Sequence, residues 1–108
     1  MTKTTEKTFT KYTLNIGKND KNKHAQIISD NDFLQIIYCE LNANGIDGAT
    51  FSDCVGIYNG EIEKALQVDI IDLDEKITPN KLKTISANLC DKLNQNEIIT
   101  SKTQINIF

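Results

Sequence analysis

Side chains able to do covalent or acid–base chemistry are few in this chain, and their spacing matches no catalytic pattern. The three cysteines, Cys39, Cys54 and Cys90, lie 15 and 36 positions apart, so we expect reduced, mostly buried thiols rather than disulfides or a zinc site. The single histidine, His24, stands in the lysine-rich segment 18–24, where ammonium groups disfavour the protonated imidazole of a general acid. Because no base is paired with a nucleophile, we predict a protein that is not an enzyme and has no cofactor.

Two short motifs could hold an ion but are explained by local structure. Asp30-x-Asp32 lacks the remaining ligands of a calcium loop and is better placed to cap a helix. Gly45-x-x-Gly48 falls between an expected helix and an expected strand, whereas a phosphate loop follows a strand and precedes a helix. Neither motif predicts a metal or phosphate site.

Charge is distributed unevenly along the chain. Residues 1–23 carry six lysines against two acids, a charge of +4, and residues 30–75 carry eleven acids against Lys64 alone, a charge of −10. Residues 76–108 have a charge of +3, so the net charge of the chain is −3. All twelve basic residues are lysine, so the chain lacks the guanidinium fork that best binds phosphate or guanine. An acidic chain that lacks a stripe of basic residues with stacking aromatic side chains is not expected to bind nucleic acid directly.

The elements that must position these residues follow from periodicity. Residues 11–17 alternate in polarity as a half-buried strand. Residues 33–41 have apolar residues at helical spacing, with Ser29 or Asp30 as N-cap and Gly45 as the terminator. Thr78-Pro79 opens a second helix that continues through Asn94, and residues 97–108 alternate as a last strand.

Between the helices, Asn59-Gly60 indicates a type I′ hairpin joining strands 49–58 and 61–70. Such a turn pairs Tyr58 with Glu61 and places Val55, Ile57 and Ile62 on an apolar side, opposite a polar and acidic side. Asp53 falls on the apolar side opposite Leu66. We expect a β-bulge there, the alternative being a buried acid with a raised pKa.

The order β-α-β-β-α-β predicts a ferredoxin-like α+β fold, with a four-stranded antiparallel sheet of order 4-1-3-2 and two helices on one face. A winged helix or an α+β roll fits less well, because only one helix precedes the hairpin. We expect a flexible segment over residues 1–8 and one domain over 9–108. No apolar run approaches the length of a membrane span and residues 1–7 lack a signal-peptide core, so we predict a cytoplasmic protein.

Several stretches resemble small ferredoxin-like proteins of Gram-positive plasmids, conjugative elements and phages. They are Tyr12-Thr13-Leu14 through Gly17-x-Asn19-Asp20-Lys21, Asp47-Gly48-Ala49-Thr50, Gly56-Ile57-Tyr58 and residues 63–70. Some such proteins are anti-CRISPR inhibitors, so the resemblance implies an inhibitor of a host defence system.

From the charge map and this resemblance we predict a non-enzymatic inhibitor, most specifically an anti-CRISPR, that binds a basic protein surface such as a CRISPR effector nuclease. The predicted partner-binding residues are Tyr58, Glu61, Glu63, Asp69, Asp72 and Asp74. The alternative is a homodimeric domain that binds a small ligand or nucleotide signal, as a sensor or sponge. Neither a membrane nor nucleic acid is an expected partner.

Overall fold

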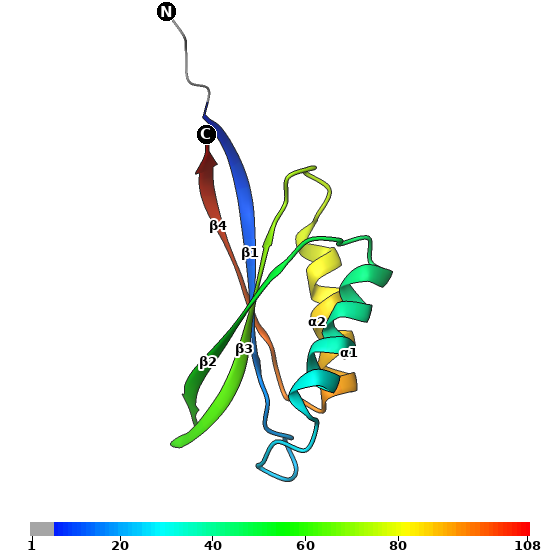
Figure 1. Ribbon diagram of the computed structural model, residues 1–108, viewed down its shortest axis with the longest axis vertical. Coiled ribbons are helices and arrows are strands. Elements are labelled where there is room, and N and C mark those ends of the chain that lie inside the picture. Colours follow the sequence, from blue (N-terminus) through cyan, green and yellow to red (C-terminus); the bar gives the residue numbers. More distant parts are fainter. Residues whose placement is uncertain (1–5) are drawn as a thin grey trace, which may run out of the picture.

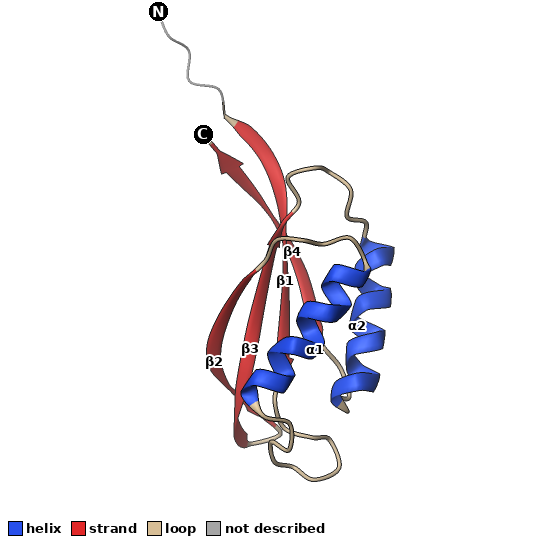
Figure 2. Cartoon of the chain, turned by 45° about the vertical axis from the view of Figure 1, so that its right-hand side comes forward, coloured by secondary structure: helices blue, strands red, loops and turns tan. Residues whose placement is uncertain are grey.

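The computed structural model describes residues 6–108 and contains the six predicted elements in the predicted order (Figure 1). They are β1 (Lys7–Gly17), α1 (Asp30–Ala43), β2 (Thr50–Tyr58), β3 (Glu61–Ile71), α2 (Pro79–Leu93) and β4 (Ile99–Ile107). The strands form one antiparallel sheet of order β2-β3-β1-β4. Both helices lie on the same side of it (Figure 2). The ferredoxin-like prediction and its strand order are confirmed.

Each helix begins and ends where the capping signals indicate. The Ser29 hydroxyl accepts a hydrogen bond from the backbone N–H of Asp32 at the start of α1, and Thr78 does the same for Lys81 at the start of α2. Gly45, with φ of 77°, follows the end of α1 in the left-handed conformation that favours glycine. Asn94 takes that conformation after α2.

The hairpin has the predicted turn and the predicted register. Asn59 and Gly60 both have positive φ, at 51° and 79°, as a type I′ turn requires. Tyr58 pairs with Glu61, and the ladder continues without interruption to Thr50 opposite Asp69. The expected bulge at Asp53 is therefore wrong.

The core lies between the helices and the centre of the sheet. Its members include Leu14 and Ile16 of β1, Val68 of β3, Ile37 of α1 and Leu89 of α2, all of which have no measurable exposure. Because side chains alternate across a strand, Asn15 and Gly17 of β1 lie on the opposite face, which no helix covers. That uncovered face is called the open face below.

The outer half of the hairpin extends past the helices, so its apolar side is not part of the core (Figure 1). Val55, Ile57 and Ile62 are 69%, 73% and 75% exposed, although they lie on the helix-facing side. Asp53 lies on the same side and is neither bulged nor buried. Its exposed carboxylate pairs with the Lys18 ammonium at 3.3 Å.

The two helices are joined by a buried carboxylate that the sequence analysis did not single out. Glu40 of α1 is 4% exposed and accepts hydrogen bonds from Lys92 at 2.7 Å, Asn88 at 3.0 Å and Asn44 at 2.9 Å. Burial alone would raise the pKa of Glu40, but these donors outweigh it and hold the pKa below its ordinary value. Lys92 and Asn88 belong to α2, so the group fixes the helix pair.

The ends of the chain differ slightly from the predicted domain boundary. Residues 1–5 of the expected flexible segment lie outside the described residues, while Lys7 and Thr8 already belong to β1 and pair with β4. The β1–β4 ribbon extends past the helices at the end opposite to the hairpin turn (Figure 1). Over residues 6–108, neither helix has the length and apolar character needed to cross a membrane.

Candidate functional site

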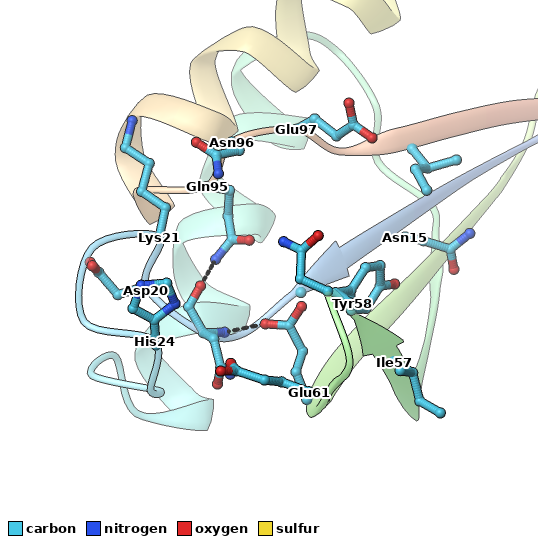
Figure 3. Close-up of a pocket in the computed structure, with 15 residues that line it drawn as sticks. Asn15, Asp20, Lys21, His24, Ile57, Tyr58, Glu61, Gln95, Asn96 and Glu97 are labelled. Atoms are coloured by element: carbon cyan, nitrogen blue, oxygen red, sulfur yellow. Dashed lines mark hydrogen bonds between the residues drawn. The ribbon is translucent and has the colours of Figure 1, made fainter.

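A hollow of about 500 Å³ opens on the open face, where β1 ends beside the hairpin tip (Figure 3). Three segments surround it: the end of β1 with the following loop, the hairpin tip, and the connection between α2 and β4. Its lining residues are Asn15, Gly17, Asn19, Asp20, Lys21, His24, Ile57, Tyr58, Asn59, Glu61, Glu63, Gln95, Asn96, Glu97 and Ile99. Segments that are far apart in the sequence therefore meet at one site.

Asn19 links the three walls through its backbone. Its N–H donates to the Glu63 carboxylate at 2.9 Å, and its carbonyl accepts from the Gln95 side-chain amide at 2.6 Å (Figure 3). Gln95 is 9% exposed, so this second bond is protected from water. Hydrogen bonds of this kind hold the hairpin, the loop and the α2–β4 connection in fixed relative positions.

Glu63 is positioned by a close approach to Gly17. A Cβ atom added to Gly17 would lie 2.5 Å from Glu63 Oε1 and 2.8 Å from its Cδ, well inside normal contact distance. Glycine at this strand end is therefore what lets the carboxylate lie flat against the β1 backbone. Glu63 is one of the six predicted contact residues, whereas Gly17 is not among them.

The loop after β1 is organised around Asp20, which is 5% exposed. Its carboxylate accepts from the Asn94 side chain at 2.7 Å and from the backbone N–H groups of Asn22 and Lys23 at 2.9 and 3.0 Å. The bond from Asn94, followed by those from the backbone, holds the pKa of Asp20 below its ordinary value. Asp20 thus stays ionised while it shapes the loop that presents Lys21 and His24.

Lys18 lies behind this loop, on the helix-facing side. Although the residue is only 6% exposed, its ammonium reaches Asp30 at 3.1 Å and Asp53 at 3.3 Å. Burial would lower the pKa of Lys18, but the two carboxylates outweigh it and raise the pKa above its ordinary value. Lys18 is therefore buried and paired with carboxylates. The lysine-rich segment 18–24 thus presents fewer ammonium groups at the surface than its sequence indicates.

Tyr58 forms the hairpin wall of the hollow. Its ring lies against Gly56, where an added Cβ would be 2.5 Å from the ring carbon Cε2. The residue is 38% exposed, so an aromatic surface remains open to the hollow. Such a ring can stack on a planar ligand or lie beside a cation.

The charge of the lining favours a cationic ligand. Four carboxylates line the hollow, from Asp20, Glu61, Glu63 and Glu97, against the ammonium of Lys21 and the imidazole of His24. Glu61 and Glu97 are exposed, whereas Asp20 is occupied by its own donors. The site therefore has carboxylates able to bind ammonium or sulfonium groups or sugar hydroxyls, and little positive charge for phosphate.

The six predicted contact residues do not form one surface. Tyr58, Glu61 and Glu63 line the hollow, but Asp69 lies farther along the open face, where it accepts from Thr13 at 2.7 Å and from Gln67. Asp72 is 7% exposed, and both its oxygens accept backbone N–H groups, from Lys76 and Ile77.

Asp72 therefore organises the β3–α2 loop, and it is not an open contact. Asp74, in the same loop, is exposed. The β3–α2 loop lies at the end of the molecule opposite to the hairpin turn (Figure 1). Sequence reasoning missed Asn19, Gln95 and Glu97, because only the folded topology brings the β1 and α2 ends together.

The thiols lie outside the hollow, and the expectation of mostly buried cysteines is wrong, since Cys39 is exposed and the other two are half-buried.

No protein-family model and no curated protein matches the chain. Among solved structures, a phage SAM lyase in complex with S-methyl-5′-thioadenosine matches with a TM-score of 0.70 and 20% identity, over 92% of this chain and 88% of the other. The same phage enzyme in its apo state gives 0.72 and 19%, over 93% and 89%. A nitrogen regulatory PII-like protein of Thiomonas intermedia K12, bound to ADP, AMP and bicarbonate, gives 0.55 and 7%, over 96% and 97%.

These likenesses establish the fold and overturn two functional predictions. The expectations of a non-enzymatic anti-CRISPR inhibitor and of no enzymatic activity are corrected, because structures matching most of both chains are those of an enzyme. The resemblance to mobile-element proteins, the basic protein partner and the cytoplasmic location stay predictions.

Proposed function

We propose that the chain is an enzyme that cleaves S-adenosylmethionine (SAM) and releases S-methyl-5′-thioadenosine, with the carboxylate-lined hollow as its active site. The observation that carries the proposal is the convergence of Glu61, Glu63 and Glu97 with the Tyr58 ring on one hollow. The likeness in fold to a phage SAM lyase supports it.

Ligand charge distinguishes this substrate from the nucleotides bound by the PII-like protein. SAM carries a sulfonium, an ammonium and one carboxylate, for a net charge of +1, whereas AMP and ADP are anions at neutral pH. A wall of carboxylates attracts the first and repels the second. The charge of the site therefore favours a positively charged adenosyl compound such as SAM over a nucleotide.

The chemistry requires no nucleophile or base from the protein. Release of S-methyl-5′-thioadenosine breaks the bond between sulfur and Cγ of the methionyl chain, and the bonding electrons stay on sulfur as it becomes a neutral thioether. The substrate's own carboxylate can supply the new bond to Cγ, which closes a five-membered lactone. Charge and protons balance, because the sulfonium and the carboxylate neutralise each other and the ammonium is unchanged.

The residues of the hollow then act by binding and orientation. Tyr58 offers a face on which adenine can stack, and Glu61 and Glu97 are placed to accept from ribose hydroxyls or the substrate ammonium. Glu63, fixed by Asn19 and Gly17, gives the site a rigid negative charge. Holding the methionyl chain folded, with the carboxylate in line with the breaking bond, is a sufficient source of rate enhancement.

The test is to incubate the purified chain with SAM and to quantify S-methyl-5′-thioadenosine by chromatography, against SAM alone in buffer. We expect a rate above the buffer rate that is proportional to protein and is reduced in a Glu61→Gln, Glu97→Gln double variant. Both side chains are exposed, so this variant should fold normally. Product formation that the double variant leaves unchanged would place the activity elsewhere, and no product above the buffer rate would refute cleavage.

A second candidate is ligand binding without turnover, which the PII-like structure with ADP and AMP favours. Melting temperatures in the presence of SAM, S-methyl-5′-thioadenosine and AMP separate the two. Stabilisation by AMP with no product from SAM would favour a nucleotide-binding domain. Stabilisation by SAM together with product formation would favour the lyase.

A further inference from the structure

We infer that the end of α2 positions the Glu63 carboxylate for substrate, with Gln95 as the positioning residue. Asn94 and Gln95 together are called the clamp below. The inference rests on the proposed function in one respect, because it assigns Glu63 to the binding of SAM. Its structural part concerns contacts between two segments far apart in the sequence and can be tested without substrate.

The clamp joins two consecutive residues to three consecutive residues of the loop after β1. The Gln95 side-chain amide donates to the Asn19 carbonyl at 2.6 Å, and the Asn94 side-chain amide donates to the Asp20 carboxylate at 2.7 Å. The Asn94 carbonyl accepts from the backbone N–H of Lys21 at 3.0 Å. Each loop residue from 19 to 21 is therefore bonded to the end of α2.

The clamp is itself held by the way in which α2 ends. Asn94 has φ of 51° and ψ of 54°, the left-handed conformation that favours glycine and that asparagine tolerates. The backbone N–H groups of Asn94 and Gln95 both donate to the Cys90 carbonyl. A glycine would end the helix equally well but has no side chain to hold Asp20. Asn94 thus serves both as the helix cap and as part of the clamp.

The contacts of the clamp are shielded from water. Gln95 is 9% exposed and Asp20 is 5% exposed. Among the described residues 6–108, no buried side-chain nitrogen or oxygen lacks a hydrogen-bond partner. A shift of the loop away from α2 would leave such groups unsatisfied, which is costly. The clamp is therefore a firm reference for the position of the loop.

The loop in turn fixes Glu63 through one backbone N–H. Asn19 donates to the Glu63 carboxylate at 2.9 Å, and its two hydrogen bonds are the dashed lines of Figure 3. Gly17 leaves room for that carboxylate, and Asn19 supplies its donor. Because a displacement of about 1 Å in a binding group is enough to change kinetics, a clamp that holds Asn19 also controls how Glu63 meets the substrate.

The kinetic test is Gln95→Met, which keeps the approximate length of the side chain and removes the donor. We expect KM for SAM to rise by about 10-fold, the equivalent of one lost hydrogen bond, with kcat within about 2-fold of the natural value. Asn88→Leu is the matched control, because it removes an amide of α2 that donates to Glu40, outside the hollow. Its KM should equal that of the natural chain.

Coupling to Glu63 separates positioning from a general loss of structure. In the Glu63→Gln background, Gln95→Met should change KM by less than about 2-fold, because the charge whose position it sets is gone. A merely structural role would give the same rise in both backgrounds. That result, or a KM of Gln95→Met equal to that of the natural chain, would overturn the inference.

Amide hydrogen exchange, followed by NMR without substrate, tests the structural part alone. Exchange of the Asn19 N–H should be about 10-fold faster in Gln95→Met than in the natural chain, whereas the N–H groups in the middle of the interior strand β3 keep their rates. Asn94→Gly, which keeps the helix end and removes the other side-chain donor, should also speed exchange at Asn19. It serves as the second variant if Gln95→Met does not fold.

The exchange result distinguishes failure of the clamp from failure of the proposed function. Unchanged exchange at Asn19 in the folded variants would overturn the inference, whether or not SAM is cleaved. Faster exchange in a chain that releases no product from SAM would refute the proposed cleavage and support the clamp as the element that holds Glu63.

Discussion

Two groups of carboxylates in this molecule show how the same functional group is used for stability and for binding. Glu40 is 4% exposed and accepts from three side-chain donors, two on α2 and one at the C-cap of α1. Glu61 and Glu97 stand exposed around the hollow, and within residues 6–108 the Glu63 carboxylate accepts one hydrogen bond, from the backbone N–H of Asn19. A carboxylate saturated with donors holds its own fold together, whereas one with free acceptor capacity beside a hollow is available to a ligand.

The sharpest test of this comparison is the charge of Glu63. Glu63→Gln keeps the size of the side chain and an acceptor for Asn19 but removes a negative charge from the lining of the hollow. We expect kcat/KM for SAM cleavage to fall by about 10- to 100-fold, the range of a charge-assisted contact.

The unfolding free energy of Glu63→Gln should stay within about 0.5 kcal/mol of that of the natural chain. Asp74→Asn is the matched control, because it also removes one carboxylate but at the far end of the molecule. Equal activity of Glu63→Gln and Asp74→Asn would contradict the assignment of Glu63 to the site.

Glu40 should show the opposite profile. Glu40→Ala leaves Asn88 and Asn44 without their carboxylate partner between the helices, so we expect a loss of about 1–3 kcal/mol in unfolding free energy by urea titration. SAM cleavage below the unfolding transition should be unchanged. A drop in activity with full stability would mean that the helix pair takes part in the site.

Substituting each of two glycines by alanine tests by steric displacement whether the Glu63 carboxylate belongs to the site. Gly17→Ala places a methyl group where the Glu63 carboxylate now lies, so we expect KM for SAM to rise by about 10-fold as that carboxylate is displaced. Gly48→Ala is the control, because a Cβ there has no atom within 4 Å. Indistinguishable kinetics of the two variants would show that the Gly17 contact does not position Glu63.

The smallest expected effect is the dependence of stability on pH. The folded pKa of Glu40 lies below its ordinary value of 4.5, so its contribution is fully present above about pH 4.5 and is lost as the pH falls through the folded pKa. Glu40→Gln cannot titrate, so the stability difference between it and the natural chain should narrow on acidification. Urea unfolding at a series of pH values measures this difference, and a constant difference would contradict the role of ionised Glu40.

Most of the fold could be predicted because its signals are local. Asn59-Gly60 sets the hairpin register, and the Ser29 and Thr78 caps set where the helices begin. The error at Asp53 had a physical cause: the helices do not reach the hairpin tip, so a charged residue on the helix-facing side needs no bulge. How far a helix extends over a sheet depends on packing, which periodicity does not report.

The site was less predictable than the fold. Tyr58, Glu61 and Glu63 stood out by charge, but Gln95 and Asn19 are polar residues in loops with no motif of their own. The prediction of no enzyme rested on the lack of a base–nucleophile pair. That criterion fails for a reaction in which the substrate carries both its nucleophile and its leaving group.

The position of Tyr58 also has an optical consequence. The chain has no tryptophan and three tyrosines, of which Tyr12 is buried and bonded to the Ile77 carbonyl, Tyr38 is exposed on α1 and Tyr58 lines the hollow. Tyr58→Trp would give the molecule a single indole, and an adenine that stacks on it would quench its emission. The wall of the hollow can thus become a fluorescent reporter of occupancy that is separate from any measurement of product.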